Sequence, residues 1–311
     1  MSLAELQRVA KRTPKGAARQ ETPDNKAALM FLGPWIVGFL GLTLGPMVAS
    51  LVLSFTNYNL LSNAKFIGIA NYVRMLHDTR LHQSLKVTFL YVVTGVPLQL
   101  IVALGLALIL DRGMRGLAFY RSAFYLPSLL GSSVAIAVLW RLVFGSDGLF
   151  NSVLGWFGIH STTSWIGDSR TALWTIVLLH VWTFGSPMII FLAGLRQIPR
   201  ELYEAAQTDG ASRLRQFRHI TIPLLTPIIF FNLVLAIIGA FQAFTQAFVV
   251  SNGTGAPADS TLFYTLYLYQ QGFGQFHMGY ASAMAWLLLV IVAVLTVVNF
   301  WASKFWVHYD D

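Results

Sequence analysis

The sequence predicts an all-α membrane protein with six transmembrane helices. Of its 311 residues, 56% are hydrophobic and only 11% are charged, which leaves more apolar surface than one soluble core of ordinary composition encloses. The apolar residues also gather into blocks of roughly 20 or more, the length at which a helix crosses about 30 Å of hydrocarbon. Several such blocks predict several passes through a bilayer.

A basic segment precedes the apolar blocks. Residues 1–26 are polar and rich in Lys and Arg, so we predict a cytosolic tail followed by a membrane domain over residues 27–311. A signal peptide is the alternative, but the first apolar block is longer than an h-region of about 7–15 residues. The six predicted spans are 27–55, 85–110, 122–140, 171–195, 222–250 and 281–303.

The basic residues outside the tail mark one side of the membrane. Residues 251–280 hold neither Lys nor Arg, whereas the loops after the second and fourth predicted spans are rich in Arg. By the positive-inside rule, those loops and both termini are predicted to be cytoplasmic. Basic residues at membrane edges, in place of one continuous stripe, argue against nucleic-acid binding despite the net charge of +8. The arginines concerned are Arg112, Arg115, Arg121, Arg196, Arg200, Arg213, Arg215 and Arg218.

The predicted spans contain almost no ionisable side chain. Lys86 lies at an edge, and His180 is the remaining candidate at membrane depth. Ion-coupled carriers generally need such groups, so the pattern favours an uncharged solute with energy supplied by another subunit. Coupling to Na⁺ through backbone carbonyls keeps a stand-alone secondary carrier or facilitator open as the alternative. Prolines inside the spans predict kinks, and they are Pro34, Pro46, Pro97, Pro127, Pro187 and Pro227.

The sequence lacks common motifs for nucleotide binding, metal binding and nucleophilic catalysis. It has no cysteine, no G-x-x-x-x-G-K-[ST] phosphate loop, no H-E-x-x-H and no G-x-S-x-G. We therefore predict that the chain is not an enzyme and holds no cofactor or metal of its own. If ATP drives its activity, a partner subunit binds the nucleotide.

The loop between the fourth and fifth predicted spans, residues 196–221, reads as two short helices. Pro199 fits the start of the first helix, with Glu201 near the positive end of its dipole. Gly210 permits the positive φ that ends a helix, and Ser212 is placed to cap a second one. Two interpretations of this loop follow from these residues. It is either a surface on which another protein docks or an ordinary solvated connection.

This loop resembles the EAA loop of bacterial ATP-binding-cassette importer permeases. Glu204-Ala205-Ala206 is followed after three residues by Gly210, after nine more by Ile220, and then by 222–223, where Ile replaces a consensus leucine. The resemblance implies the type I importer permease fold and a coupling role in which the loop docks on an ATPase subunit. The residues that it implicates are Glu204, Ala205, Ala206, Asp209 and Gly210.

Further stretches resemble the carbohydrate, or maltose-type, branch of those permeases. They are residues 66–72, parts of 121–151, 241–244 and 279–283, whereas 251–257 departs from the branch's tighter glycine cluster. The resemblance implies a sugar importer in the bacterial inner membrane. It also implies the partners: a second permease subunit, ATPase subunits that bind ATP, an external solute-binding protein and the carbohydrate itself. The particular sugar stays open.

A sugar path needs uncharged hydrogen-bonding groups and aromatic rings, because sugars present hydroxyls and apolar C–H faces. The fifth predicted span offers Gln242 and Gln246, which are four residues apart and would share a face of one helix. Hydrogen bonding between helices is the alternative role for each candidate. The predicted pathway residues are Trp182, Gly185, Ser186, Asn232, Phe241, Gln242, Phe244 and Gln246.

Aromatic residues also gather outside the spans, between residues 261 and 276. They predict an interfacial aromatic belt, with contact to an external binding protein as the alternative. The residues are Phe263, Tyr264, Tyr267, Tyr269 and Phe273.

Overall fold

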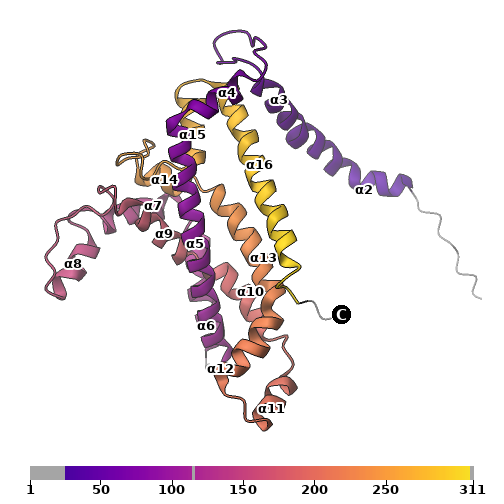
Figure 1. Ribbon diagram of the computed structural model, residues 1–311, viewed down its shortest axis with the longest axis vertical. Coiled ribbons are helices and arrows are strands. Elements are labelled where there is room, and N and C mark those ends of the chain that lie inside the picture. Colours follow the sequence, from indigo (N-terminus) through magenta and orange to yellow (C-terminus); the bar gives the residue numbers. More distant parts are fainter. Residues whose placement is uncertain (1–24, 114–115, 309–311) are drawn as a thin grey trace, which may run out of the picture. The chain divides into compact units, whose positions relative to one another are not determined.

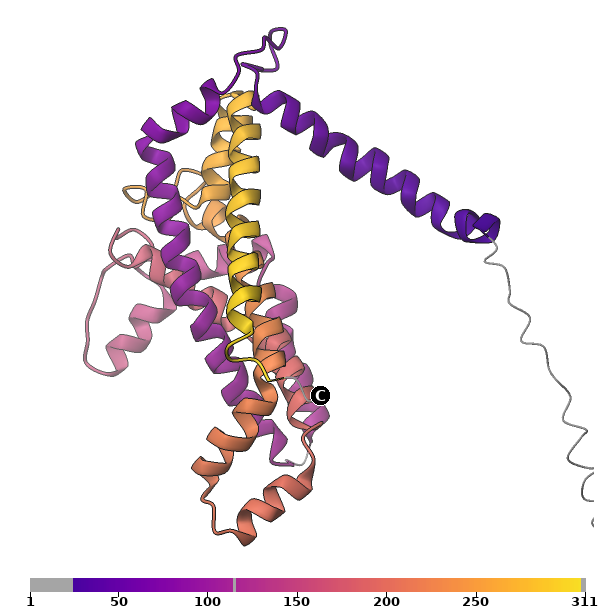
Figure 2. The same cartoon turned by 45° about the vertical axis from the view of Figure 1, so that its right-hand side comes forward.

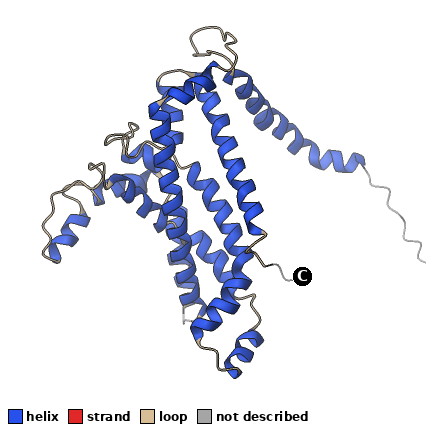
Figure 3. Cartoon of the chain, in the orientation of Figure 1, coloured by secondary structure: helices blue, strands red, loops and turns tan. Residues whose placement is uncertain are grey.

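The computed structural model describes residues 25–113 and 116–308, so most of the predicted basic tail lies outside the described residues. The described residues form helices and loops, with one isolated bridge between Thr56 and Phe66 (Figure 3). The prediction of an all-α protein is confirmed for this part of the chain.

The chain divides into two compact units, residues 1–49 and 50–311. The first unit holds α2 (Asn25–Gly38), the π-helical turn η1 (Phe39–Leu44) and the start of α3 (Gly45–Ser54). The apolar stretch Met30–Ser54 is long enough to cross a membrane, as predicted for residues 27–55.

In the second unit a single long helix, α5 (Thr79–Asp111), is the centre of the packing (Figures 1 and 2). One side of α5 is lined with small and branched side chains such as Val96, Ala103 and Ala107, all buried, which allows close helix contacts. The second and sixth predicted spans are confirmed as helices by α5 and α16. Helices packed on α5 are α9 (Ala172–Trp182), α10 (Gly185–Leu195), α13 (Ile222–Phe241) and α15 (Tyr264–Tyr269), while α16 (Met278–Ser303) packs on α13.

The third and fourth predicted spans are each broken by a bend, where the sequence predicted one kinked helix, whereas the fifth lies within one candidate span, Arg213–Val250. The third consists of α6 (Leu117–Leu130) and α7 (Val134–Val143), which differ in direction by 95°. In the fourth, α9 and α10 differ by 41°. The fifth contains α13 and a short α14 (Thr245–Val250), separated by three residues. The sharp turn in the third span lies at 131–133, where Ser133 accepts a hydrogen bond from the Ile136 N–H and so starts a new helix.

Shorter elements complete the second unit. The loop 196–221 contains the two short helices that the sequence predicts there, and Gly210 between them has a φ of +74°. Ser212 accepts a hydrogen bond from the Arg215 N–H and so caps the second of these helices. The remaining elements are α4 (Ala70–His77), α8 (Leu149–Trp156), α11 (Arg200–Thr208), α12 (Arg213–Gln216) and the π-helical turns η2 (Phe217–Thr221) and η3 (Gln270–Gly274).

Half of the aromatic residues between 261 and 276 are core residues. Phe263, Tyr264 and Tyr267 are at most 3% exposed, because α15 packs against α5 and α16. Tyr269, Phe273 and Phe276 are exposed. The predicted aromatic belt is therefore wrong for the three buried residues.

A carboxylate joins several elements at the end of the bundle that carries α4 and α15 (Figure 1). Asp78 caps α5 by accepting a hydrogen bond from the Leu81 N–H at 3.0 Å. Its Oδ2 accepts two more, from the Tyr280 hydroxyl at 2.6 Å and the Tyr267 hydroxyl at 2.8 Å. Nearby, Arg80 forms a bidentate pair with Asp259. The capping carboxylate thus ties the start of α5 to α15 and α16.

These contacts set the pKa values of the groups. Burial raises the pKa of Asp78, but the hydrogen bonds from Tyr280, Leu81 and Tyr267 together outweigh it and lower the pKa below its usual value. Burial and the bond to Asp78 raise the pKa of Tyr267 to about 12. Asp78 therefore acts as a carboxylate and Tyr267 as a neutral donor at neutral pH.

We expect Asp78→Ala to destabilise the chain at pH 7 by about 1.5 kcal/mol, the low end for hydrogen bonds to a charged group because Asp78 is partly exposed. Since the folded pKa of Asp78 is lowered, its contribution is present above the unfolded pKa and is lost as the pH falls through the folded pKa. Thermal unfolding in detergent between pH 3 and pH 7 measures both effects. The parent and Asp78→Ala should converge in acid, and Asp147→Ala, at an exposed carboxylate, should match the parent at every pH. A constant gap would contradict the assignment.

Candidate functional site

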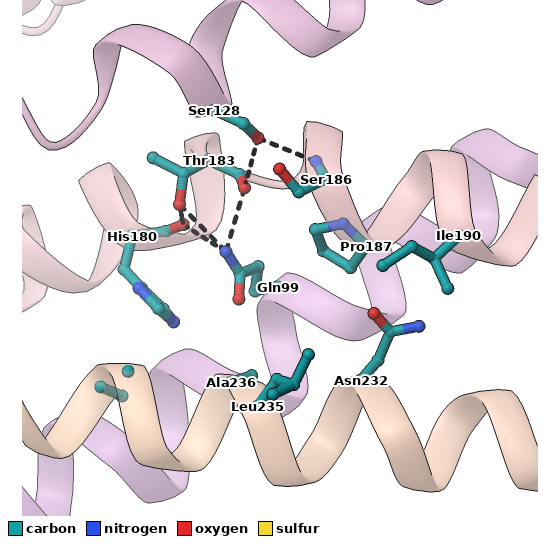
Figure 4. A pocket seen from close by; sticks show the side chains of 12 residues that line it. Gln99, Ser128, His180, Thr183, Ser186, Pro187, Ile190, Asn232, Leu235 and Ala236 are labelled. Atoms are coloured by element: carbon teal, nitrogen blue, oxygen red, sulfur yellow. Dashed lines mark hydrogen bonds between the residues drawn. The ribbon is translucent and has the colours of Figure 1, made fainter. Parts of the chain in front are cut away.

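An open cavity of about 290 Å³ lies between the candidate spans and is lined by residues of α5, α6, α9, α10 and α13. Its polar lining consists of amides, hydroxyls and one imidazole, and no Asp, Glu, Lys or Arg among the described residues lines it. Figure 4 shows the side chains of α13 facing those of α5, α9 and α10 across it. The polar residues are Gln99, Ser128, His180, Thr183, Ser186 and Asn232, and the apolar ones include Pro187, Ile190, Leu235 and Ala236.

Several of these polar side chains form hydrogen bonds with backbone groups at the break between α9 and α10. A broken helix frees backbone carbonyls, and no water is present in hydrocarbon to pair with them. The Gln99 amide donates to the backbone oxygens of His180 at 3.3 Å and Thr183 at 3.1 Å, and to the Thr183 hydroxyl at 2.9 Å. Ser128 donates to the Thr183 carbonyl and accepts from the Ser186 N–H, both at 2.9 Å (Figure 4). The break is therefore stabilised by side chains of α5 and α6.

Other polar atoms are left for a ligand. The Gln99 and Asn232 amide nitrogens donate to backbone carbonyls, and their side-chain oxygens form no hydrogen bond within the described chain. The His180 Nε2 is buried without a hydrogen-bond partner among the described residues. The cavity therefore offers two amide oxygens as neutral acceptors beside an apolar wall, which suits a ligand with hydroxyl groups and C–H faces.

Sequence reasoning missed Gln99 and Ser128. Gln99 is a lone amide in the apolar half of α5, and this is the signal that would have identified it. Ser128 gives no such signal, because a serine in a span commonly bonds to its own helix. Its role depends on the neighbouring helix break.

We expect Gln99→Leu to lower the stability of the chain by about 1–2 kcal/mol, because the carbonyls at the α9–α10 break lose their donor. Unfolding in detergent, followed by size-exclusion chromatography after heating, measures the loss. The matched control is Thr94→Val on the same helix, whose hydroxyl bonds only to its own helix. Equal midpoints for the two variants would show that Gln99 does not brace the break.

Two of the predicted pathway residues, Ser186 and Asn232, line the cavity. Gly185 is buried against α6 and does not line it. Trp182 packs near Trp140, with ring centroids 6.0 Å apart. Phe241 is 2% exposed, and Phe244 lies against Phe248 and Tyr269.

The glutamine pair of the fifth span is separated by the helix break. α13 ends at Phe241, and Gln246 belongs to α14, so Gln242 and Gln246 do not lie on one face of a continuous helix. Gln242 is exposed, whereas Gln246 donates at 3.1 Å to the Gly131 carbonyl at the turn between α6 and α7. This hydrogen bond pairs with a backbone carbonyl at the break in the third span.

At the opposite end of the second unit from α4, the loop 196–221 projects α11 (Figure 1). Glu204, Ala205, Asp209 and Gly210 are exposed, and Ala206 is half-buried beside a hollow of about 400 Å³ between α11 and α12. The Tyr203 hydroxyl lies 2.9 Å from the Thr221 hydroxyl. This hydrogen bond links α11 to the last residue of η2, directly before the start of α13.

Comparison with known proteins gives one family match. A model of the family described as "Binding-protein-dependent transport system inner membrane component" matches residues 87–305. That range contains both the cavity and the loop 196–221.

Curated relatives match almost the whole chain. It is 52% identical over 295 residues to the probable ABC transporter permease protein YesP of Bacillus subtilis, covering 94% of this chain and 96% of the relative. It is 34% identical to the arabinooligosaccharides transport system permease protein AraP of the same organism, covering 88% and 87%. It is also 34% identical to the lactose transport system permease protein LacF of Rhizobium radiobacter, covering 88% and 93%.

Solved structures share the fold. A chain in the crystal structure of a bacterial alginate ABC transporter, in complex with an alginate pentasaccharide-bound periplasmic protein, superposes with a TM-score of 0.75 at 21% identity. The match covers 90% of this chain and 94% of that one. A chain of a bacterial ABC transporter involved in the import of alginate gives 0.69 at 20% identity, covering 96% and 98%.

Proposed function

Because this chain belongs to the family of binding-protein-dependent transport system inner membrane components, we propose that it forms half of the solute pathway of an ATP-driven sugar importer. The chain is an ABC transporter permease and a multi-pass membrane protein, and its relatives are transport permeases and not enzymes. The family match over residues 87–305 carries the proposal, since it spans the cavity and the exposed loop together.

The chemistry of the cavity supports a saccharide as the solute. Amide and hydroxyl groups without a fixed charge match sugar hydroxyls, and Pro187 and Leu235 offer surface to C–H faces. The relatives are named for arabinooligosaccharides, lactose and starch degradation products. We assign a neutral oligosaccharide or disaccharide to this chain on those two grounds.

Coupling to ATP is assigned to the loop 196–221. The exposed acids and small residues of α11 suit docking on an ATPase subunit, and the bond between Tyr203 and Thr221 would transmit its movement to α13. Because α13 forms one wall of the cavity, closure of two ATPase subunits would change access to the solute, a domain motion between two states. ATP itself would be bound by the partner, since this chain has no phosphate loop.

Three further assignments complete the proposal. A second, homologous permease subunit would close the other half of the pathway. An external solute-binding protein would deliver the sugar, as the periplasmic protein in the alginate transporter structure suggests. The chain would lie in the inner membrane of a bacterial cell with both termini in the cytoplasm, and the Arg-rich loops support this orientation.

Uptake into proteoliposomes tests the proposal. The chain, its partner permease, its ATPase and its binding protein would be reconstituted, and uptake of radiolabelled arabinooligosaccharides and lactose measured with and without ATP at the ATPase side. We expect uptake of at least one saccharide that requires all four proteins and ATP. Uptake by this chain alone, without ATP, would instead identify a stand-alone carrier.

A further inference from the structure

A short helix, α8, and the turn after it extend sideways from the bundle of the second unit (Figures 1 and 2). This segment, residues 149–159, lines neither the cavity of the candidate functional site nor the hollow between α11 and α12. It follows α7, the helix that turns by 95° from α6. The transport mechanism proposed above gives it no role.

The helix that leads toward this segment, α6, is too short to cross the hydrocarbon by itself. α6 has 14 residues and starts at the same end of the second unit as α11 (Figure 1). At about 1.5 Å per residue it rises about 21 Å of the roughly 30 Å that the hydrocarbon measures. α7 then runs nearly at right angles to α6, and α8 follows it at the side of the bundle, nearer than α7 to the end that carries α11 (Figures 1 and 2). With 8 residues, α8 is too short to span a bilayer.

The inner face of α8 is firmly held. Asn151 donates to the Ser146 carbonyl at 2.8 Å and to the Thr163 carbonyl at 2.9 Å, and it accepts from the Trp165 indole N–H at 2.7 Å. Phe150 packs on the Trp165 ring with centroids 5.2 Å apart. The segment therefore presents a fixed outer face.

That outer face is apolar and aromatic. Trp156 is 82% exposed and Phe157 is 78% exposed, with Leu149 and Ile159 also more than half exposed. Residues 148–167 contain no Asp, Glu, Lys or Arg. A face of this kind has no favourable contact with water.

The apolar face continues the surface of a candidate span. Val138 and Leu142 on α7 are exposed, and α6 and α7 together are long and apolar enough to form one broken span. Beyond Ile159 the chain becomes polar, with His160 and Thr162 exposed. Apolar residues followed by a polar turn, with Trp at the boundary, are typical of a segment at the edge of a bilayer.

We propose that residues 149–159 form an interfacial membrane anchor at the side of the bundle, with Phe157 and Ile159 among the lipid chains, Trp156 at the boundary and 160–163 among the headgroups. The anchor would hold the broken third span at a fixed depth. This inference is independent of which solute the chain carries.

Spin-label accessibility tests the anchor directly, since the chain has no cysteine and each label site is unique. The variants are Phe157→Cys and Ile159→Cys on the apolar face, with Thr162→Cys as the matched control in the polar turn. Each is labelled with a nitroxide in the full chain, assembled with its partner permease and ATPase in phosphatidylcholine and phosphatidylglycerol nanodiscs. Collision rates with oxygen, which partitions into lipid, and with a water-soluble nickel chelate are then compared.

We expect oxygen to relax the labels at 157 and 159 at least about fivefold more effectively, relative to nickel, than the label at 162. Two results would overturn the anchor. Nickel access at 157 and 159 equal to that at 162 would place the face in water. Immobilised labels that neither reagent reaches would show that another protein subunit covers it. Two apolar sites keep the test decisive if one substitution prevents assembly.

Discussion

Gly185→Leu is expected to yield no folded chain, and Gly185→Ala is expected to lose about 2 kcal/mol or more. A Cβ at Gly185 would lie 2.5 Å from the Phe124 carbonyl oxygen and 2.7 Å from the Tyr125 Cα. Both are backbone atoms of α6, so relief requires α10 to move away from α6. That movement would also break the bonds of Ser128 to Thr183 and Ser186.

Recovery of monodisperse protein and its unfolding midpoint in detergent measure the effect. Gly105→Ala is the matched control, because Gly105 also lies inside a membrane helix and its Cβ would meet nothing within 4 Å. We expect this control to be neutral or slightly stabilised. If Gly185→Ala melted like the control, the close contact of α6 and α10 would be wrong.

Glu204→Lys is expected to reduce solute-stimulated ATP hydrolysis at least about tenfold while leaving the chain folded, since charged contacts at interfaces commonly contribute 2 kcal/mol or more. Glu204 is exposed, and its carboxylate has no ion pair or hydrogen bond with the described part of the chain. A substitution at such a position changes stability little. Any large effect must therefore come from a partner.

Glu201→Lys on the same helix is the matched control for charge. It also reverses an exposed acid, but it lies outside the segment that begins at Glu204. We expect a smaller loss for Glu201→Lys, and co-purification of the ATPase with that variant but not with Glu204→Lys. Equal losses would indicate a general electrostatic effect of the loop and would contradict a specific role for Glu204.

The part of the fold that follows from local signals was predictable. Pro199, Gly210 and Ser212 act through their own backbone geometry and nearest neighbours, so the two helices of the loop 196–221 could be placed from the sequence. The six apolar blocks are equally local, because each needs only enough apolar residues to cross the bilayer.

The helix breaks could not be predicted in the same way. The turn at 131–133 and the gap at 183–184 persist because side chains from other helices pair with the freed carbonyls. Gln99 and Gln246 are those partners, and their contacts join residues about 80 to 115 positions apart in the chain. For the same reason, a helical spacing rule joined Gln242 to Gln246 across a break that it could not detect.

The aromatic residues of 261–276 show a further limit. A belt at the membrane surface and a buried cluster have the same composition. Only the packing of α15 against α5 and α16 decides that Tyr264 and Tyr267 are buried. Likewise, hydropathy alone ended the third span at Trp140, whereas α7 continues through Arg141, which donates to Asn252 beyond α14.

Solute-stimulated ATP hydrolysis by the reconstituted complex tests the central claim most directly. The chain, its partner permease and its ATPase would be assembled in nanodiscs, with saccharide-loaded binding protein added outside. We predict that loaded binding protein stimulates hydrolysis in the parent complex, and that Glu204→Lys abolishes the stimulation while both permease subunits remain assembled. If no ATPase assembled with the parent chain, or if Glu204→Lys hydrolysed ATP like the parent, the claim that this permease is coupled to an ATPase through the loop 196–221 would be contradicted.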